Sequence, residues 1–256
     1  MLIKIPELNV PSDNPFEFDV LSRKENVEIL TQLISTLDQP FVISVDSKWG
    51  SGKTTFVRMW KQYLENNKYT VVYFNAWEND ISNDALAALV AEIKKAIEVS
   101  PDKSKSMGFF ENVKSITTKL LKRSIPVAIK LGTAGLLDAS DFVEKAISTA
   151  TEKLVVDSIE NYEKRQEDIQ KFKQELEKFA QSLNGESNKS MIFFIDELDR
   201  CRPNFAIEVL EKAKHLFNVK NIVFILSIDK NNYAIQLEQF METILILMNI
   251  YVDSLI

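Results

Sequence analysis

Four short runs of apolar and β-branched residues recur along the chain, separated by segments with helical patterns. Runs that are apolar at nearly every position are typical of strands buried on both faces of a parallel sheet. The strands that they predict cover residues 41–46, 70–75, 191–195 and 221–228. Apolar residues at intervals of three and four predict amphipathic helices. This pattern covers residues 27–37, 56–64, 86–97 and 203–217. The alternation of the two patterns predicts an α/β fold with a parallel sheet, flanking helices and right-handed crossovers.

The first strand leads into a short turn that contains two glycines. Residues 41–46 read FVISVD, and residues 47–55 read SKWGSGKTT. A buried strand, a glycine-rich turn and a Lys-Thr pair at the start of a helix predict a phosphate-binding loop. The glycines allow backbone N–H groups to turn toward phosphate oxygens, and the new helix adds the positive end of its dipole. We therefore expect the nucleotide-binding residues to be Trp49, Gly50, Ser51, Gly52, Lys53, Thr54 and Thr55.

Two side chains of this loop have specific expected roles. Lys53 would contact the β- and γ-phosphates, and the hydroxyl of Thr54 would hold Mg²⁺. The full motif has glycine where this chain has Ser47. Because serine tolerates tight turns less well than glycine, the sequence predicts a different start to the loop or weaker nucleotide binding.

A second constellation follows the third apolar run. Asp196 and Glu197 come directly after it, at the expected carboxyl end of a buried strand, where the phosphate-binding loop also lies. An aspartate in this place orders Mg²⁺, and a neighbouring glutamate can prepare the attacking water. Arg200 could stabilise charge in the transition state, although an ion pair with a nearby carboxylate such as Asp199 is the favoured interpretation. The end of the fourth strand, Ser227 to Asp229, is expected between the loop strand and the acid-bearing strand. A polar residue there could sense the γ-phosphate or position the water, and a strand that simply ends at a polar turn is the equal alternative.

Lys53 and Asp196 are separated by far more chain than one or two βα units of about 30 residues each would need. We therefore predict three parts: residues 1–100 as the N-terminal part of a nucleotide-binding core, 101–190 as a helical insertion, and 191–256 as the C-terminal part of the core. From Val155 to Leu183 the apolar spacing predicts one long amphipathic helix. Packing on its own domain is favoured over contact with an effector protein or a second copy, and packing of 109–150 is favoured over binding to a membrane surface.

Composition indicates which ligands and which cellular compartment to expect. The formal net charge of −6 does not indicate nucleic-acid binding. A single cysteine, Cys201, excludes a disulfide within the chain, and the apolar run near residues 125–137 is too short to span a bilayer. The absence of a signal-peptide pattern at Met1 completes the expectation of a cytoplasmic protein without an integral membrane span.

Three stretches resemble one known family, the KAP P-loop NTPases, a bacterial and animal group related to plasmid-encoded phage-exclusion proteins. They are residues 49–55 (WGSGKTT), 73–78 (YFNAWE) and 194–203 (FIDELDRCRP). The resemblance implies ATP and Mg²⁺ as ligands, ATPase activity and a role in phage defence. Family members often carry membrane-spanning helices where this chain has its insertion. Residues 241–256 do not resemble the family's further strand and helical lid, which predicts a truncated or variant C-terminal part and weak hydrolysis.

The resulting hypothesis is an ATPase that drives a regulatory or assembly switch, with Lys53, Asp196, Glu197 and Arg200 as catalytic residues and Thr54 and Asp196 as metal ligands. A nucleotide-binding scaffold that recruits an effector through the insertion is the alternative. A kinase acting on a small molecule or nucleic acid is disfavoured, since no acceptor site is identified. No motif separates ATP from GTP.

Overall fold

The computed structural model describes residues 9–37, 39–82, 84–100, 102–123, 143–184 and 189–229. Its centre is a sheet of four strands in the order β1-β4-β3-β2. The strands are β1 (Phe41–Asp46), β2 (Val71–Asn75), β3 (Met191–Asp196) and β4 (Ile222–Ile228). Every neighbouring pair is parallel, so all four carboxyl ends meet at one edge. Helices connect the strands, as the alternating pattern predicts: the fold is α/β.

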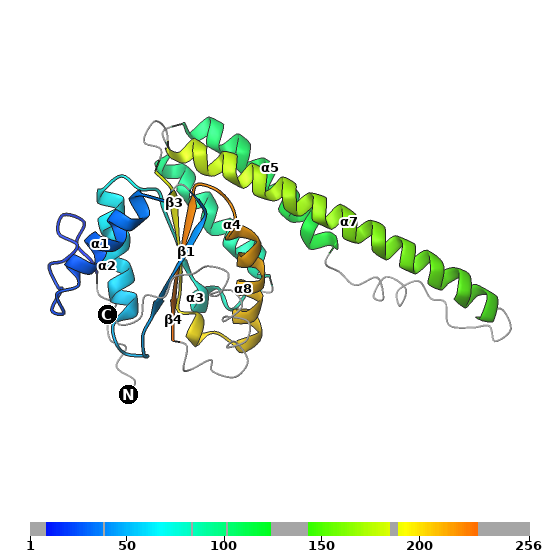
Figure 1. The fold of residues 1–256 in the computed structure, drawn as a ribbon, viewed down its shortest axis with the longest axis horizontal. Coiled ribbons are helices and arrows are strands. Elements are labelled where there is room, and N and C mark those ends of the chain that lie inside the picture. Colours follow the sequence, from blue (N-terminus) through cyan, green and yellow to red (C-terminus); the bar gives the residue numbers. More distant parts are fainter. Residues whose placement is uncertain are drawn as a thin grey trace.

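Residues of each strand alternate between two cores, one on each face of the sheet. Phe194 faces the core that contains Trp60, whereas its neighbour Phe193 stacks on Phe224 in the other core. Figure 1 shows α1 and α2 on one face of the sheet, and α4 and α8 on the other. The helices of these two layers are α1 (Lys24–Ser35), α2 (Lys53–Asn66), α3 (Ala76–Asn79), α4 (Ala85–Lys95) and α8 (Pro203–Leu216). Both faces of the strands are covered, which explains why their sequences are apolar throughout.

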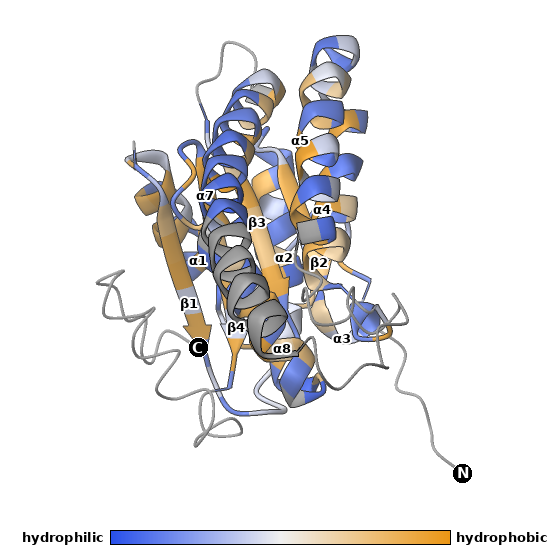
Figure 2. Cartoon of the chain, turned by 90° about the vertical axis from the view of Figure 1, so that its right-hand side faces the viewer, coloured by the Kyte–Doolittle hydropathy of each residue, from blue (hydrophilic) through white to orange (hydrophobic). Residues whose placement is uncertain are grey.

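Two long helices, α5 (Lys103–Arg123) and α7 (Val143–Asn184), form a helical arm that extends from the α4/α8 side (Figure 1). At its root, buried Phe110 and Phe179 contact each other with ring centroids 6.0 Å apart. The solvent-facing surface of α7 is hydrophilic where its side chains are described (Figure 2). A short 3₁₀ helix (Ala96–Val99) joins α4 to the arm. Whether residues 101–190 form a separate domain stays a prediction, since the root of the arm shares a core with the sheet.

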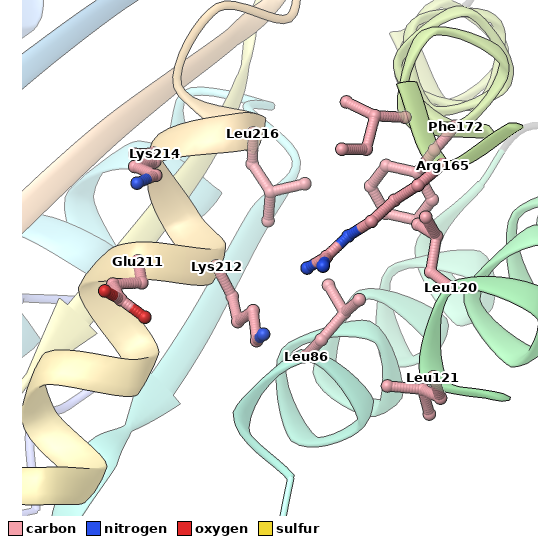
Figure 3. Close-up of a pocket in the computed structure, with 10 residues that line it drawn as sticks. Leu86, Leu120, Leu121, Arg165, Phe172, Glu211, Lys212, Lys214 and Leu216 are labelled. Atoms are coloured by element: carbon pink, nitrogen blue, oxygen red, sulfur yellow. The ribbon is translucent and has the colours of Figure 1, made fainter. Parts of the chain in front are cut away.

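A hollow of about 160 Å³ lies where the arm meets the core (Figure 3). It is lined by residues of α4, α5, α7 and α8, among them Leu86, Leu120 and Phe172. Arg165 of α7 and Lys212 of α8 point into it (Figure 3), and Glu211 and Lys214 of α8 also belong to its lining. None of the predicted nucleotide-binding residues lines this hollow.

Most element bounds agree with the sequence patterns, and the single long helix predicted over 155–183 is part of α7. Residues 22–25 have capping-box spacing, which predicts Ser22 as the cap of the first helix. That prediction is wrong: α1 begins at Lys24, whose N–H donates to Asp19 Oδ2 at 2.9 Å, and Ser22 has φ +54°. Residues 103–106, whose composition is typical of a linker, already belong to α5. The predictions for 125–137 and 230–256 lie outside the described residues.

Candidate nucleotide-binding site

The loop between β1 and α2 depends on left-handed backbone at two glycines. Gly50 has φ +80° and Gly52 has φ +87°, a region that residues with a side chain rarely adopt. Ser47 is not among the described residues with positive φ, so its backbone does not require glycine. Its hydroxyl donates to the Ser51 hydroxyl at 2.7 Å and closes the loop on itself. The loop start therefore differs from the full motif by a hydrogen bond between two serine hydroxyls, and the backbone accommodates Ser47 without strain.

Lys53, the first residue of α2, crosses the inside of the loop. Its Nζ donates to the carbonyl of Ser47 at 2.7 Å and lies 3.5 Å from Asp199 Oδ2. Both side chains are largely buried, with 7% and 4% of their surface exposed. The Lys53 amine therefore lies between the loop and the acids that follow β3, although 146 positions separate it from Asp199. Thr54 and Thr55 follow in the first turn of α2.

The Glu197 side chain contacts groups from three other elements or turns of the site. Its backbone is left-handed, with φ +60°, and its side chain is buried. The Thr54 hydroxyl donates to Oε1 at 3.3 Å, and Asn75 Nδ2 donates to Oε2 at 3.1 Å. Arg200 Nη1 is 3.0 Å from Oε1. Burial raises the pKa of Glu197 above its usual range, and the Arg200 charge partly offsets this.

Asp196, at the end of β3, is almost fully buried and uses both oxygens within the protein. The Tyr73 hydroxyl donates to Oδ2 at 2.9 Å, and the Glu197 N–H donates to Oδ1 at 2.9 Å. Burial, with the neighbouring Asp196 charge second, raises the pKa of Tyr73 far above its usual range, so this phenol stays a donor. The Thr54 hydroxyl contacts the carboxylate of Glu197. Asp196 is the preceding residue, and its two oxygens accept from Tyr73 and from the Glu197 N–H.

Arg200 pairs with Glu197, and the expected partner Asp199 pairs with Lys53 instead. Its guanidinium lies 5.9 Å from the ring centroids of both Trp49 and Trp77. The two tryptophans are 66% and 53% exposed, so they form the rim of the site. The arrangement holds Arg200 next to the acid it neutralises.

Two further residues complete the site, Arg23, which sequence reasoning missed, and Asp229, which belongs to the predicted end of the fourth strand. Arg23 donates to the carbonyls of Ser51 and Gly52, and Asp229 Oδ2 accepts from the Trp49 N–H at 2.7 Å. Asp229 directly follows β4, which lies between β1 and β3 as predicted for the strand that carries Ser227. Ser227 Oγ is buried and has no hydrogen-bond partner among the described residues. The polar end of a central strand is the sequence signal that points to Asp229, whereas nothing in the sequence marks Arg23.

The oxygen groups of the site fit a magnesium ion that arrives with a nucleotide. Within the described ranges, no three His, Cys, Asp or Glu side chains are grouped around a common metal position. Mg²⁺ does not need such a cage, because it usually binds through one or two carboxylates, water and substrate phosphates. The Thr54 hydroxyl contacts the buried Glu197 carboxylate, and Asp196, the residue before Glu197, carries a second buried carboxylate. Together they are such a partial set of ligands.

A parallel sheet with a glycine loop, a lysine and a threonine at the start of a helix, and acids at the neighbouring strand end defines a P-loop nucleotide-binding domain. The sequence matches the KAP family P-loop domain over residues 23–254, and the chain belongs to this family. A search of curated proteins finds no match. Within the part of the chain that the structure describes, no helix is both long and apolar enough to cross a membrane.

Proposed function

We propose that this KAP-family protein binds ATP with Mg²⁺ at the loop and hydrolyses it to drive a regulatory or assembly switch. The observation that supports this best is the convergence of loop and acids: Lys53 lies 3.5 Å from Asp199, and Thr54 donates to Glu197 across 143 positions of sequence. A contact over that separation joins the two motifs that nucleotide hydrolysis needs. A role in phage defence rests on family analogy alone.

In this proposal the chain supplies positioning and one proton acceptor. Loop N–H groups and Lys53 bind the phosphates, and Thr54 and Asp196 are the residues that would hold Mg²⁺, which supplies positive charge against the phosphate oxygens when bound. Glu197 accepts a proton as water attacks the γ-phosphorus in line. The new P–O bond forms while the bond to the β–γ bridging oxygen breaks, and ADP leaves with that electron pair. A raised pKa makes Glu197 a better proton acceptor than an exposed glutamate.

One observation favours the second candidate, a nucleotide-binding scaffold without turnover. Both oxygens of Glu197 already accept from protein groups, namely Thr54, Asn75 and Arg200. A carboxylate that keeps all three contacts has little freedom to take a proton from water. In that case the arm would recruit an effector while ATP stays intact.

Phosphate release by the purified chain with ATP and Mg²⁺ distinguishes these candidates. We expect Glu197→Gln to lower kcat by about 10²–10⁴-fold, the usual contribution of a general base, while ATP affinity stays within about threefold. The matched control is Glu175→Gln on the arm, where Glu175 pairs with exposed Lys178 and turnover should be unchanged. ATP binding with equal phosphate release in wild type and Glu197→Gln would contradict the assigned base, and binding without any release would favour the scaffold.

Mass in solution, measured with and without ATP, tests the switch. A nucleotide-dependent change in mass would support an assembly step. An unchanged mass would contradict assembly and support a switch by conformational change within one chain. Phosphate transfer that depends on an added acceptor would instead support a kinase.

A further inference from the structure

Arg23 is a buried cation on the outer side of the phosphate-binding loop. It is the residue immediately before α1, and only 5% of its surface is exposed. Nη1 donates to the Gly52 carbonyl at 2.9 Å, and Nη2 donates to the Ser51 carbonyl at 2.6 Å. The guanidinium therefore bonds to two successive peptide groups of the loop from a position 28 and 29 residues earlier in the chain.

These two hydrogen bonds help to fix the direction in which the loop amides point. At Gly52 they act together with the Phe56 N–H, which donates to the same carbonyl at 3.0 Å, whereas the Ser51 carbonyl is held by Arg23. In a planar trans peptide the carbonyl oxygen and the following N–H point in opposite directions. A guanidinium that holds the Ser51 and Gly52 carbonyls on the α1 side therefore holds the N–H groups of Gly52 and Lys53 on the other side. Neither N–H donates to another described residue, as expected for donors at the start of a helix. They are the kind of donor that an anion at a helix N-terminus accepts from.

The packing around Arg23 is close. A methyl group at Gly52 would lie 3.1 Å from Arg23 Nη1, so the glycine provides room for the guanidinium as well as a left-handed backbone. Arg23 makes no ion pair with a described carboxylate. Asp19, whose charge acts on Arg23, accepts from the Lys24 N–H. Burial lowers the pKa of Arg23 and the Asp19 charge partly offsets this, but an arginine stays protonated in proteins, so the guanidinium is charged beside the loop carbonyls.

Attachment of α1 to the core does not account for this arrangement, because other contacts provide it. Val27, Leu30 and Ile34 of α1 are buried in the core with 0–3% exposure. In addition, Trp60 of α2 donates to the Thr31 hydroxyl at 3.0 Å. The packing of α1 does not need Arg23, whose hydrogen bonds are made to carbonyls of the loop.

We propose that Arg23 is a positioning residue for phosphate binding, which orients the Gly52 and Lys53 amides toward the nucleotide and couples α1 to the loop. The inference rests on the proposed function, because it needs the loop to bind ATP. Arg23 itself touches neither the nucleotide nor the attacking water. Its loss should therefore weaken nucleotide binding more than it slows the chemical step.

Calorimetric titration of MgATP into Arg23→Met and Arg23→Lys tests this inference. Methionine keeps the apolar stem without donors, and we expect about tenfold or more loss of affinity, as for two charge-assisted hydrogen bonds. Lysine keeps the charge but cannot bind both carbonyls in a fork, so its affinity should lie between wild type and methionine. In turnover assays KM should rise with the dissociation constant while kcat stays within about threefold.

Arg165→Met is the matched control, since Arg165 lies on the arm at the hollow and should change affinity less than twofold. Wild-type affinity in Arg23→Met would overturn the inference and leave the proposed function intact. The loss of cooperative thermal unfolding in both Arg23 variants would also overturn the inference. The inference assigns Arg23 to the loop, and such a loss would show that the whole fold depends on it. A wild-type protein that does not bind MgATP would overturn the proposed function, and the inference with it.

Discussion

The carboxyl edge of the sheet and the helical arm use charged residues in opposite ways. At the edge, charged side chains are buried and have partners from distant parts of the chain: Lys53 pairs with Asp199, and Glu197 accepts from Thr54 and Asn75. On the arm, the paired lysines are exposed and their partners lie within one helix turn, as in Lys164–Glu160 and Lys178–Glu175. Local pairs of this kind support a helix, whereas distant buried pairs fix the geometry of a site.

The energetic consequences differ accordingly. Breaking a buried ion pair leaves an uncompensated charge and typically costs about 3–5 kcal/mol. An exposed pair contributes about 0–1 kcal/mol, since water and salt screen it. The arm therefore depends on its apolar root, and the edge depends on its polar network. The predictions below test this division from the largest expected effect to the smallest.

The largest stability effect is expected at the root of the arm. Leu176 of α7 is completely buried in the core that the arm shares with the sheet. Leu176→Ala should lower the free energy of unfolding in urea by about 2–5 kcal/mol, because it removes apolar contacts and leaves a cavity. A loss below about 1 kcal/mol would show that the arm is not part of the core.

An intermediate effect is expected at the edge, in the pH dependence of turnover. Glu197 must be ionised to accept a proton, so turnover should fall as the pH falls through its raised pKa. The Arg200 charge favours the ionised form, and Arg200→Met should therefore raise this pKa further and move the acidic limb to higher pH. The measurement is kcat against pH for both proteins.

The same titration decides whether Arg200 acts on the transition state. If the role of Arg200 is to pair with Glu197, Arg200→Met should shift the pH of the acidic limb and change kcat on the alkaline plateau only slightly. A plateau loss of about 10³-fold or more, with an unmoved limb, would assign it as a transition-state arginine. That result would contradict the role drawn from its 3.0 Å contact with Glu197.

The smallest effect is expected for the exposed arm pairs. Lys178 and Glu175 are 2.7 Å apart on α7, and the lysine is 53% exposed. Lys178→Ala should change the free energy of unfolding by less than about 0.5 kcal/mol. A loss near that of Leu176→Ala would erase the distinction between root and surface.

The sequence predicts the sheet and the loop because their signals are local. Buried parallel strands are apolar on both faces, and the glycine, lysine and threonine of the loop lie within five residues, Gly50 to Thr54. The Glu197 contacts could not be predicted, since they depend on left-handed backbone at φ +60° and on the register that pairs Asn75 with Asp196. Arg23 could not be predicted either, because it recognises backbone carbonyls, which every residue has.

The central claim is that the loop lysine and the distant acids act on one nucleotide. Titration of MgATP into Lys53→Ala, with Lys178→Ala as the matched lysine control, tests it most directly. We expect at least about 100-fold weaker binding for Lys53→Ala, since a buried phosphate-binding charge is removed, and unchanged binding for Lys178→Ala. Equal affinity of Lys53→Ala and the wild-type protein for MgATP would contradict the account.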